Sequence, residues 1–233
     1  MMAKTQPDTG HDRVQHSLLS GPERRFTRWF CARAPARVTP DVLTAIGVAG
    51  SLFVFAGYAL SRLSPAFLWL ASFGLLVNWF GDSTDGNLAR HRRIERPRYG
   101  FFIDHSVDSL SMLLVFAGLG VSPYLRMDVA LFGLVAYLLM SIFVYLDTLV
   151  NRTFQISFGY VGPTEARLGL ILANTAMWAI GRPRWTAPWG EVYVYDGLVT
   201  VAASLLVAGY VGMTSQRLRR LAKLDPPGGQ GPT

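Results

Sequence analysis

Four aspartates form two close pairs near the middle of the chain, in the stretch DSTDGNLARHRRIERPRYGFFIDHSVD. Asp82 and Asp85 are three residues apart, and Asp104 and Asp108 are four residues apart. On a helix, these spacings place the members of each pair on one face. Apolar runs flank the stretch on both sides, and carboxylates at the ends of lipid-embedded helices are costly unless cations neutralise them. The pattern therefore predicts a metal site at a membrane surface.

The carboxylates also indicate which metals and which chemistry. Hard divalent cations such as Mg²⁺ and Mn²⁺ prefer carboxylate oxygens and keep open positions for phosphate. Two such ions can bridge a pyrophosphate, neutralise the leaving phosphate and orient an in-line attack. The predicted ligands are Asp82, Asp85 and Asp104, with a contribution from Asp108. The site is thus predicted to hold two Mg²⁺ or Mn²⁺ ions.

The composition places these residues in a membrane protein. Of the 233 residues, 51% are hydrophobic and 16% are charged. Several runs reach the roughly 20 apolar residues that cross a bilayer. We predict an all-α integral membrane protein with six transmembrane helices, at 42–61, 66–90, 101–121, 127–150, 166–181 and 195–213. The fifth has the shortest apolar core, and an in-plane or tilted helix is the alternative there.

The distribution of basic residues predicts the orientation. With both termini in the cytosol, the cytosolic segments hold 18 Lys and Arg, and the outer loops hold only Arg62, Arg126, Arg182 and Arg184. This is a strong positive-inside bias, and it places the active site on the cytosolic side, of the cell inner membrane if the protein is bacterial. The net charge of +7 suits anionic lipid headgroups and phosphorylated substrates, although topology alone explains most of it. We expect no nucleic-acid partner.

Three regions follow along the chain. Residues 1–40 are predicted to be a cytosolic N-terminal arm containing an interfacial amphipathic helix that starts near Pro22. Residues 41–215 form the six-helix transmembrane catalytic domain, and residues 216–233 are expected to be a disordered cytosolic tail. The first 40 residues lack the apolar segment of a cleavable signal peptide.

Three local features of the sequence are a predicted helix cap, a single cysteine and an aromatic loop. Thr39 is predicted to cap the first spanning helix, with Pro40 at its first position. Cys31 is the single cysteine of the chain, so no internal disulfide and no cysteine-based metal cluster are expected. The Trp- and Tyr-rich loop GRPRWTAPWGEVYVYD is interpreted as an interfacial aromatic belt, with lipid entry or a dimer contact as the alternative.

Small and basic residues complete the central motif, which reads Asp82-x2-Asp85-Gly86-x2-Ala89-Arg90, then nine residues, then Gly100-x3-Asp104-x3-Asp108. This motif resembles the signature of the CDP-alcohol phosphotransferase (CDP-alcohol phosphatidyltransferase) family, integral membrane enzymes that make phospholipids. That family usually has eight residues between the arginine and the later glycine. Its six-helix plan with a short amphipathic N-terminal helix also fits the hydropathy of this chain.

The resemblance implies roles for single residues. Gly86, Ala89 and Gly100 would help form the CDP pocket, where small side chains let a flat nucleotide approach the backbone; close helix packing is the alternative reason for them. Arg90 can bind phosphate oxygens in bidentate fashion. Asp108 would take the proton from the attacking hydroxyl, acting as a weak base late in the reaction. The family also implies a homodimer.

Other polar residues are open to two interpretations. Glu165 and Arg167, in the segment GPTEAR, either begin the fifth helix or lie near the acceptor alcohol. Asp147, Asn151 and Arg152 are candidates for lining the same cavity. His105 is interpreted as a hydrogen-bonding neighbour of the aspartates rather than a ligand. The remaining loop arginines are interpreted mainly as a solvated face that fixes the topology.

The predicted function is transfer of a phosphatidyl group from CDP-diacylglycerol to a small polar alcohol, with release of CMP. The alternative is transfer of a phosphocholine- or phosphoethanolamine-type group from a CDP-alcohol to diacylglycerol, because both reactions use the same motif. Two other classes remain, a cation transporter and a non-catalytic membrane scaffold. A transporter would not need small residues and an arginine at fixed places, and a scaffold would not need four aspartates.

Overall fold

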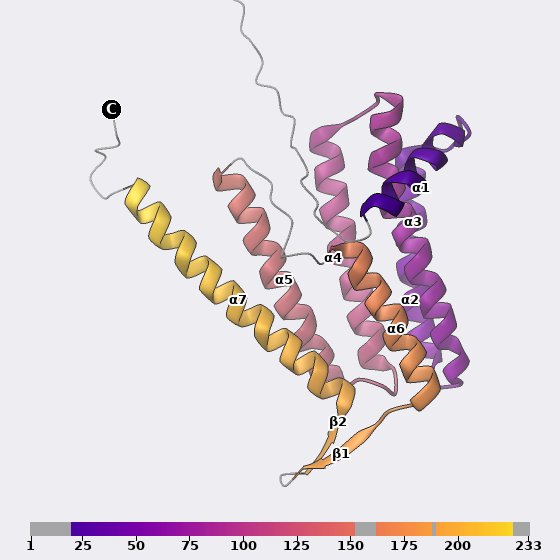
Figure 1. The fold of residues 1–233 in the computed structure, drawn as a ribbon, viewed down its shortest axis with the longest axis vertical. Coiled ribbons are helices and arrows are strands. Elements are labelled where there is room, and N and C mark those ends of the chain that lie inside the picture. The colour runs from indigo at the N-terminus through magenta and orange to yellow at the C-terminus, as the bar shows by residue number, and fades with distance from the viewer. Residues whose placement is uncertain (1–19, 152–161, 188–189, 226–233) are drawn as a thin grey trace, which may run out of the picture.

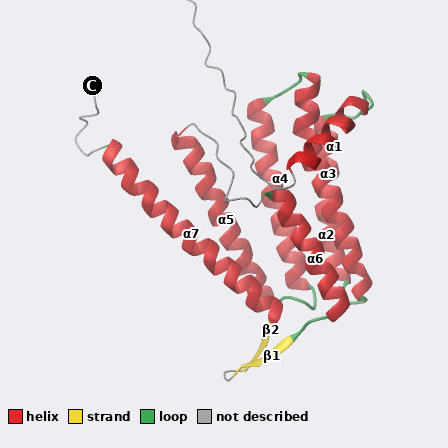
Figure 2. Ribbon diagram, in the orientation of Figure 1, coloured by secondary structure: helices red, strands yellow, loops and turns green. Residues whose placement is uncertain are grey.

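The computed structural model describes residues 20–151, 162–187 and 190–225, and these residues form a helical bundle with one β-hairpin (Figures 1 and 2). The elements in chain order are α1 (Ser20–Arg33), α2 (Pro40–Leu60), a 3₁₀ turn (Pro65–Phe67), α3 (Leu68–Arg92), α4 (Pro97–Val121), α5 (Met127–Asn151), α6 (Pro163–Ile180), β1 (Arg184–Ala187), β2 (Gly190–Tyr193) and α7 (Val194–Leu224). The described residues are mainly helical, as predicted, whereas strands β1 and β2 were not predicted. Residues 1–19, which are nearly half of the predicted N-terminal arm, lie outside the described part.

Four described helices are long and apolar enough to cross a membrane, namely α2, α4, α5 and α7. Helices α3 and α6 lie where the second and fifth spans were predicted, but they do not meet the same measure of length and hydropathy. The last turns of α3 are polar, and α6 has only 18 residues, with Glu165 and Arg167 in its first turns. The count of six spans therefore stays a prediction, as does the position of α1 at a membrane interface.

Local capping signals explain where two helices begin. The side chain of Thr39 accepts a hydrogen bond from the backbone N–H of Val42 at 3.2 Å, and Pro40 occupies the first turn of α2, as predicted. Helix α4 begins at Pro97, four residues before the predicted start, because the proline favours a first helical turn. Arg93 ends α3 in the left-handed conformation, with φ of 56°.

The last helix extends beyond the end predicted for the sixth spanning segment, at residue 213. Helix α7 continues to Leu224, so residues 216–224 are helical and do not belong to a disordered tail. Leu, Arg, Lys and Ala dominate this segment and are strong helix formers. The helix ends before the Pro226-Pro227 pair, which cannot continue it. Residues 226–233 lie outside the described part.

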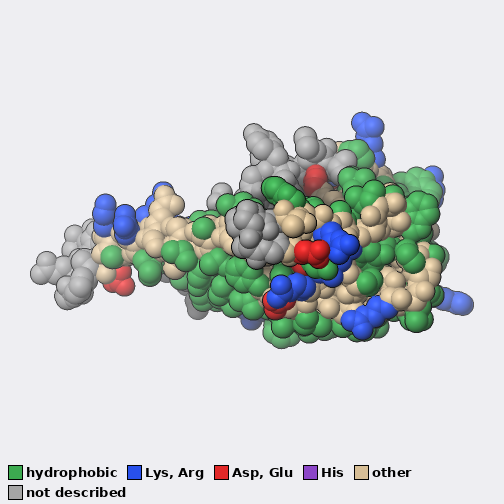
Figure 3. All heavy atoms as spheres, turned by 90° about the horizontal axis from the view of Figure 1, so that it is seen from below, with side chains coloured by type: hydrophobic (Ala, Val, Ile, Leu, Met, Phe, Trp, Pro, Cys, Tyr) green, Lys and Arg blue, Asp and Glu red, His purple; other side chains and the backbone are tan. Residues whose placement is uncertain are grey.

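The loop interpreted as an aromatic belt folds as a hairpin. Strands β1 and β2 pair antiparallel, and Trp185 is 74% exposed. The hairpin lies at the opposite end of the bundle from the turn between α3 and α4 (Figure 1). Basic and acidic side chains lie next to each other at this end (Figure 3). Its ion pairs are Arg126–Asp128, Arg182–Asp196 and Arg184–Glu191.

Glycines bring α2 and α3 into close contact. A Cβ atom on Gly81 would overlap the backbone of Gly47, and a Cβ on Gly50 would overlap the backbone of Asn78. Such close backbone approach is typical of small-residue packing between membrane helices. It aligns α3 rigidly on α2, so the aspartates at the end of α3 have a fixed place.

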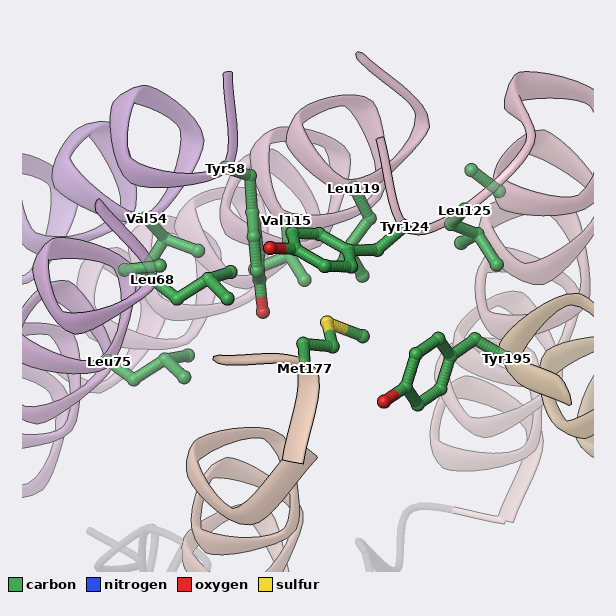
Figure 4. Close-up of a cluster of buried hydrophobic side chains, with 12 residues drawn as sticks. Val54, Tyr58, Leu68, Leu75, Val115, Leu119, Tyr124, Leu125, Met177 and Tyr195 are labelled. Carbon is green, nitrogen blue, oxygen red and sulfur yellow. The ribbon is translucent and has the colours of Figure 1, made fainter. Parts of the chain in front are cut away.

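The main hydrophobic core joins all the helices from α2 to α7 (Figure 4). Met177 projects from α6 into a space between the rings of Tyr58 and Tyr195 (Figure 4). The Tyr58 hydroxyl donates a hydrogen bond to Asn174 Oδ1 at 2.8 Å, and Asn174 donates to Ser72 Oγ at 3.1 Å. These bonds tie α6 to both α2 and α3 below the aspartates.

Replacing Gly81 by alanine should destabilise the fold. The added methyl group meets backbone atoms that cannot move aside, and overpacking of this kind costs about 1–3 kcal/mol or more. Thermal unfolding in detergent would measure the change. The matched control is Gly209→Ala on α7, because a Cβ there has no neighbour within 4 Å. Equal stability of the two variants would contradict the close α2–α3 contact.

Candidate active site

Both aspartate pairs lie toward the same end of the bundle. Asp82 and Asp85 are in the last three turns of α3, and Asp104 and Asp108 are in the first half of α4, with α2 packed against both helices. The negative charge of Asp82 interacts with those of Asp108 and Asp104. The charge of Asp85 interacts with those of Asp104 and Asp82. The structure thus places all four carboxylates toward one end of the bundle, within range of mutual electrostatic repulsion.

Arg167 neutralises one of these carboxylates. Its Nη2 donates to Asp82 Oδ2 at 2.7 Å, and its Nε donates to Asn78 Oδ1 at 2.8 Å. The side chain of Arg167 is 10% exposed. Asn78 in turn donates to the carbonyl of Gly47 and to Ser51 Oγ. A buried polar network therefore runs from α2 through Asn78 to the ion pair between α6 and α3.

Asp85 is oriented by α2. Thr44 Oγ1 donates to Asp85 Oδ2 at 2.6 Å, and the backbone N–H of Gly86 donates to Asp85 Oδ1 at 2.5 Å. Asp85 is buried, and each of its oxygens has one donor. Each carboxylate oxygen keeps a second lone pair, so the side chain is held in place with acceptor capacity left.

Asp108 faces a more open environment. Its side chain is 40% exposed, and its Oδ2 lies 4.0 Å from His105 Nδ1. The His105 ring stacks on Tyr145 with centroids 5.0 Å apart, and it meets Phe101 edge-on at 4.3 Å. These aromatic contacts hold the His105 ring beside Asp108, and a hydrogen bond between the two side chains stays a prediction. The role of His105 in chemistry stays a prediction.

The motif glycines are not explained by helix packing. A Cβ on Gly100 would meet no atom within 4 Å. A Cβ on Gly86 would meet only the flexible end of Arg90, at 3.5 Å and beyond. Gly81, five residues before Gly86, is packed against backbone. The space beside Gly86 and Gly100 is therefore available to a ligand, and Arg90, which donates to Asn87 Oδ1 at 3.1 Å, lies beside it.

The other loop arginines are mainly structural. Arg92 donates to the carbonyls of Ala34, Pro35 and Val38, which ties the turn before α2 to the end of α3. Arg96 Nη2 donates to both carboxylate oxygens of Asp41, and its guanidinium lies over the ring of Tyr99. These contacts hold the segment between α3 and α4 against the start of α2.

Comparison with known proteins identifies the family. The family model described as CDP-alcohol phosphatidyltransferase matches residues 37–210. The chain belongs to this family. It is 25% identical over 162 residues to human cholinephosphotransferase 1, covering 67% of this chain and 40% of that protein. It is 33% identical over 86 residues to phosphatidylinositol phosphate synthase of Cutibacterium acnes (strain DSM 16379 / KPA171202), covering 37% of this chain and 39% of that protein. The matches thus span about two fifths of the length of each of these two proteins.

CDP-alcohol phosphatidyltransferases use divalent metals, and the donor set here fits such ions. Four carboxylates supply the hard oxygen ligands that Mg²⁺ and Mn²⁺ prefer. Among the described residues, no group of three or more acidic, histidine or cysteine side chains is already arranged around one metal position. Arg167 donates a hydrogen bond to Asp82 Oδ2. If Asp82 binds a cation through this oxygen, the cation would take the place of Arg167.

The segment GPTEAR, residues 162–167, has one residue that caps a helix and one that reaches the candidate site. Glu165 Oε2 accepts a hydrogen bond from the backbone N–H of Gly162 at 3.0 Å, which caps the start of α6. Arg167, two residues later, binds Asp82. Asp147 of α5 pairs with Arg217 of α7, with Nε and Oδ1 2.5 Å apart. Asn151 ends α5, and Arg152 lies outside the described residues.

Sequence reasoning did not find three residues of this site. Thr44 and Asn78 hold the aspartates and Arg167, as described above. Glu23 of α1 accepts hydrogen bonds from Ser83 Oγ at 2.6 Å and from Thr164 Oγ1 at 2.9 Å. Asn78 carried a visible signal, since it is an amide inside the apolar run LWLASFGLLVNWFG.

Proposed function

We propose that this protein transfers a phosphatidyl group from CDP-diacylglycerol to a small polar alcohol and releases CMP. One observation carries the proposal. Four aspartates on α3 and α4 lie at the same end of the bundle as the open space beside Gly86 and Gly100. Carboxylates can hold the metals of a pyrophosphate site, and the open backbone can accept a nucleotide. The phosphatidylinositol phosphate synthase match supports this donor, since that protein's name denotes synthesis of a phosphatidyl lipid.

The second candidate is transfer of a phosphoalcohol group from a CDP-alcohol to diacylglycerol. The cholinephosphotransferase match favours it, because that match covers the larger share of this chain. The compact six-helix length favours the first candidate. Both reactions use the same site, and they differ only in which substrate carries CDP.

In the proposed reaction, the acceptor hydroxyl oxygen attacks the phosphorus that bears the diacylglycerol. A new O–P bond forms, and the bond from that phosphorus to the CMP oxygen breaks. Asp108 takes the hydroxyl proton as the O–P bond forms, and its partial exposure lets the acceptor reach it. Arg90 binds phosphate oxygens of the nucleotide, and Ala89 leaves room beside it with Gly86 and Gly100.

We assign metal binding to Asp82, Asp85 and Asp104, with Asp108 contributing. The two Mg²⁺ or Mn²⁺ ions, when bound, neutralise the pyrophosphate and the charge that develops on CMP. Thr44 keeps Asp85 in one orientation. Arg167 balances Asp82, and its guanidinium is well suited to bind phosphate when released from that carboxylate.

We also propose an integral membrane protein with both termini and the active site in the cytosol. Four arginines lie in the loops at the hairpin end, namely Arg62, Arg126, Arg182 and Arg184, whereas residues 90–98 alone hold five. The positive-inside rule counts Lys and Arg in short loops, so the end with the larger number of them is proposed to be cytosolic. A homodimer is proposed from family resemblance.

Labelling a single cysteine at position 95 should occur from the cytosolic side only. Glu95 is exposed in the turn between α3 and α4, so a cysteine there is accessible. The experiment uses Glu95→Cys in a Cys31→Ser background, with a membrane-impermeant maleimide on intact cells and on inverted vesicles. Leu63→Cys is the control for the other side, because Leu63 is 77% exposed at the hairpin end and a cysteine there should be labelled from outside. Labelling of position 95 from outside would invert the proposed topology.

The function is tested by measuring CMP release from CDP-diacylglycerol by purified protein with Mg²⁺ or Mn²⁺. Release that depends on an added acceptor supports phosphatidyl transfer, and a screen of glycerol phosphate, serine, inositol and inositol phosphate identifies the acceptor. Release from CDP-choline or CDP-ethanolamine with diacylglycerol would establish the second candidate. Absence of CMP release from every donor would leave the transporter and scaffold classes.

A further inference from the structure

A single carboxylate on α1 joins the two helices that meet at the Asp82–Arg167 ion pair. Glu23 accepts from Ser83, which follows Asp82 on α3, and from Thr164, which precedes Arg167 by three residues on α6. The start of α6 lies beside α1 and α3 (Figure 1). The two hydroxyl donors are 60 and 141 residues from Glu23 in the sequence, so the contact exists only in the folded bundle.

Aromatic and apolar contacts also hold α1 against its neighbours. Phe26 stacks on Trp79 with centroids 5.5 Å apart, and Phe30 meets Phe80 edge-on at 4.9 Å. Cys31 is buried against α2 and α3. Apolar contacts hold a helix on a surface without fixing its rotation or height. Hydrogen bonds from hydroxyl groups to a carboxylate are short and directional, so Glu23 sets the exact position of α1 against both neighbours.

We infer that Glu23 is a positioning residue for the transfer reaction, which fastens the start of α6 to α3 so that Arg167 meets Asp82. This inference rests on the proposed function, since it assigns Glu23 a part in that same site. Glu23 acts through Thr164 and does not touch the reacting groups. The amphipathic helix thereby has a function beyond contact with the membrane surface.

Cys31 provides a native probe of this clasp, meaning the bonds of Glu23 to Ser83 and Thr164. It is the only cysteine of the chain, and it is 4% exposed. Burial raises the pKa of the Cys31 thiol, and the positive charges of Arg92 and Arg90 offset part of that rise. A maleimide therefore reacts with Cys31 only when α1 lifts away from α2 and α3. The labelling rate reports this opening without any substrate.

The experiment measures Cys31 labelling and phosphatidyl transfer in four variants of the full chain. Glu23→Ala should raise the labelling rate about tenfold or more, which is the scale of hydrogen bonds to a charged group, and it should lower transfer. Thr164→Val removes one hydroxyl at constant volume and should lower transfer about tenfold. Thr164→Ser restores the hydroxyl and should restore transfer. Glu95→Gln, an exposed acid on the same side, should change neither quantity.

Three outcomes decide the inference. Faster labelling in Glu23→Ala, with transfer lost in Thr164→Val and recovered in Thr164→Ser, supports it. Faster Cys31 labelling in Glu23→Ala, with transfer unchanged in both Glu23→Ala and Thr164→Val, would make Glu23 an anchor of α1 alone and overturn the positioning role. Unchanged labelling in Glu23→Ala would overturn the clasp itself. If the wild-type protein has no transfer activity, the proposed function fails, and an unchanged labelling rate in Glu23→Ala would still overturn the clasp separately.

Discussion

Replacing Asp82 by asparagine should reduce transfer about a thousandfold or more, because a metal ligand is worth several kcal/mol of transition-state stabilisation. It should also weaken donor binding, since Asp82 is proposed to hold the metal that binds the pyrophosphate. Asparagine has the same shape and can still accept the hydrogen bond from Arg167. The loss would therefore come from the missing negative charge rather than from altered packing.

The ion pair adds a second effect that must be separated from the first. Arg167 is buried, so removing the charge of Asp82 takes away its directly bonded counter-ion, and breaking a buried pair in this way typically costs about 3–5 kcal/mol of stability. The double variant Asp82→Asn/Arg167→Gln removes both charges and should recover much of this stability. Its transfer activity should stay as low as that of the single variant, because the ligand charge is still missing.

Thermal unfolding and calorimetric titration with Mn²⁺ and CDP measure the two effects separately. The expected result is that the double variant has a higher melting temperature than Asp82→Asn and still binds the metal weakly. Recovered transfer in the double variant would show that Asp82 acts only as the partner of Arg167. Wild-type metal affinity in Asp82→Asn would place the ligands elsewhere. Chelation of the wild-type protein should likewise remove transfer.

The features that the sequence predicted well are those that depend on local chemistry. Thr39 and Pro40 begin α2 because a cap and a proline act within one turn. The aspartate pairs were predicted to share helix faces because spacing alone sets that geometry. The extension of α7 to Leu224 was missed because the end of an apolar run was taken as the end of the helix. A helix continues through polar residues such as Gln216 when they are good helix formers.

The polar network around the aspartates was not predictable in the same way. Thr44 and Asp85 are 41 residues apart, and Arg167 and Asn78 are 89 residues apart. Their contact depends on how α2, α3 and α6 pack, and no short spacing encodes it. Arg167 was left open between a helix start and a catalytic neighbour, and the structure places it on Asp82. Glu23 carried no signal, because an acid in a basic amphipathic helix is an ordinary surface residue.

Replacing Asp108 by asparagine should separate a base from a ligand. If Asp108 mainly takes the proton from the acceptor, the variant should lose transfer about a hundredfold or more, the usual scale of general-base catalysis. It should still bind CDP and metal with an affinity close to that of the wild-type protein. The side-chain exposures support this separation. The side chain of Asp108 is 40% exposed, whereas that of Asp82, which pairs with Arg167, is 29% exposed.

The contrast between the two variants gives the decisive measurement. Asp82→Asn should lose nucleotide affinity and transfer together, whereas Asp108→Asn should lose transfer alone. His105→Gln is the matched control beside Asp108, since it removes the imidazole 4.0 Å away and keeps the carboxylate. If His105→Gln loses less transfer activity than Asp108→Asn, the group that takes the proton of the acceptor hydroxyl is the carboxylate of Asp108. If Asp108→Asn loses nucleotide affinity as fully as Asp82→Asn, Asp108 is primarily a metal ligand, and the proton must leave the acceptor by another route.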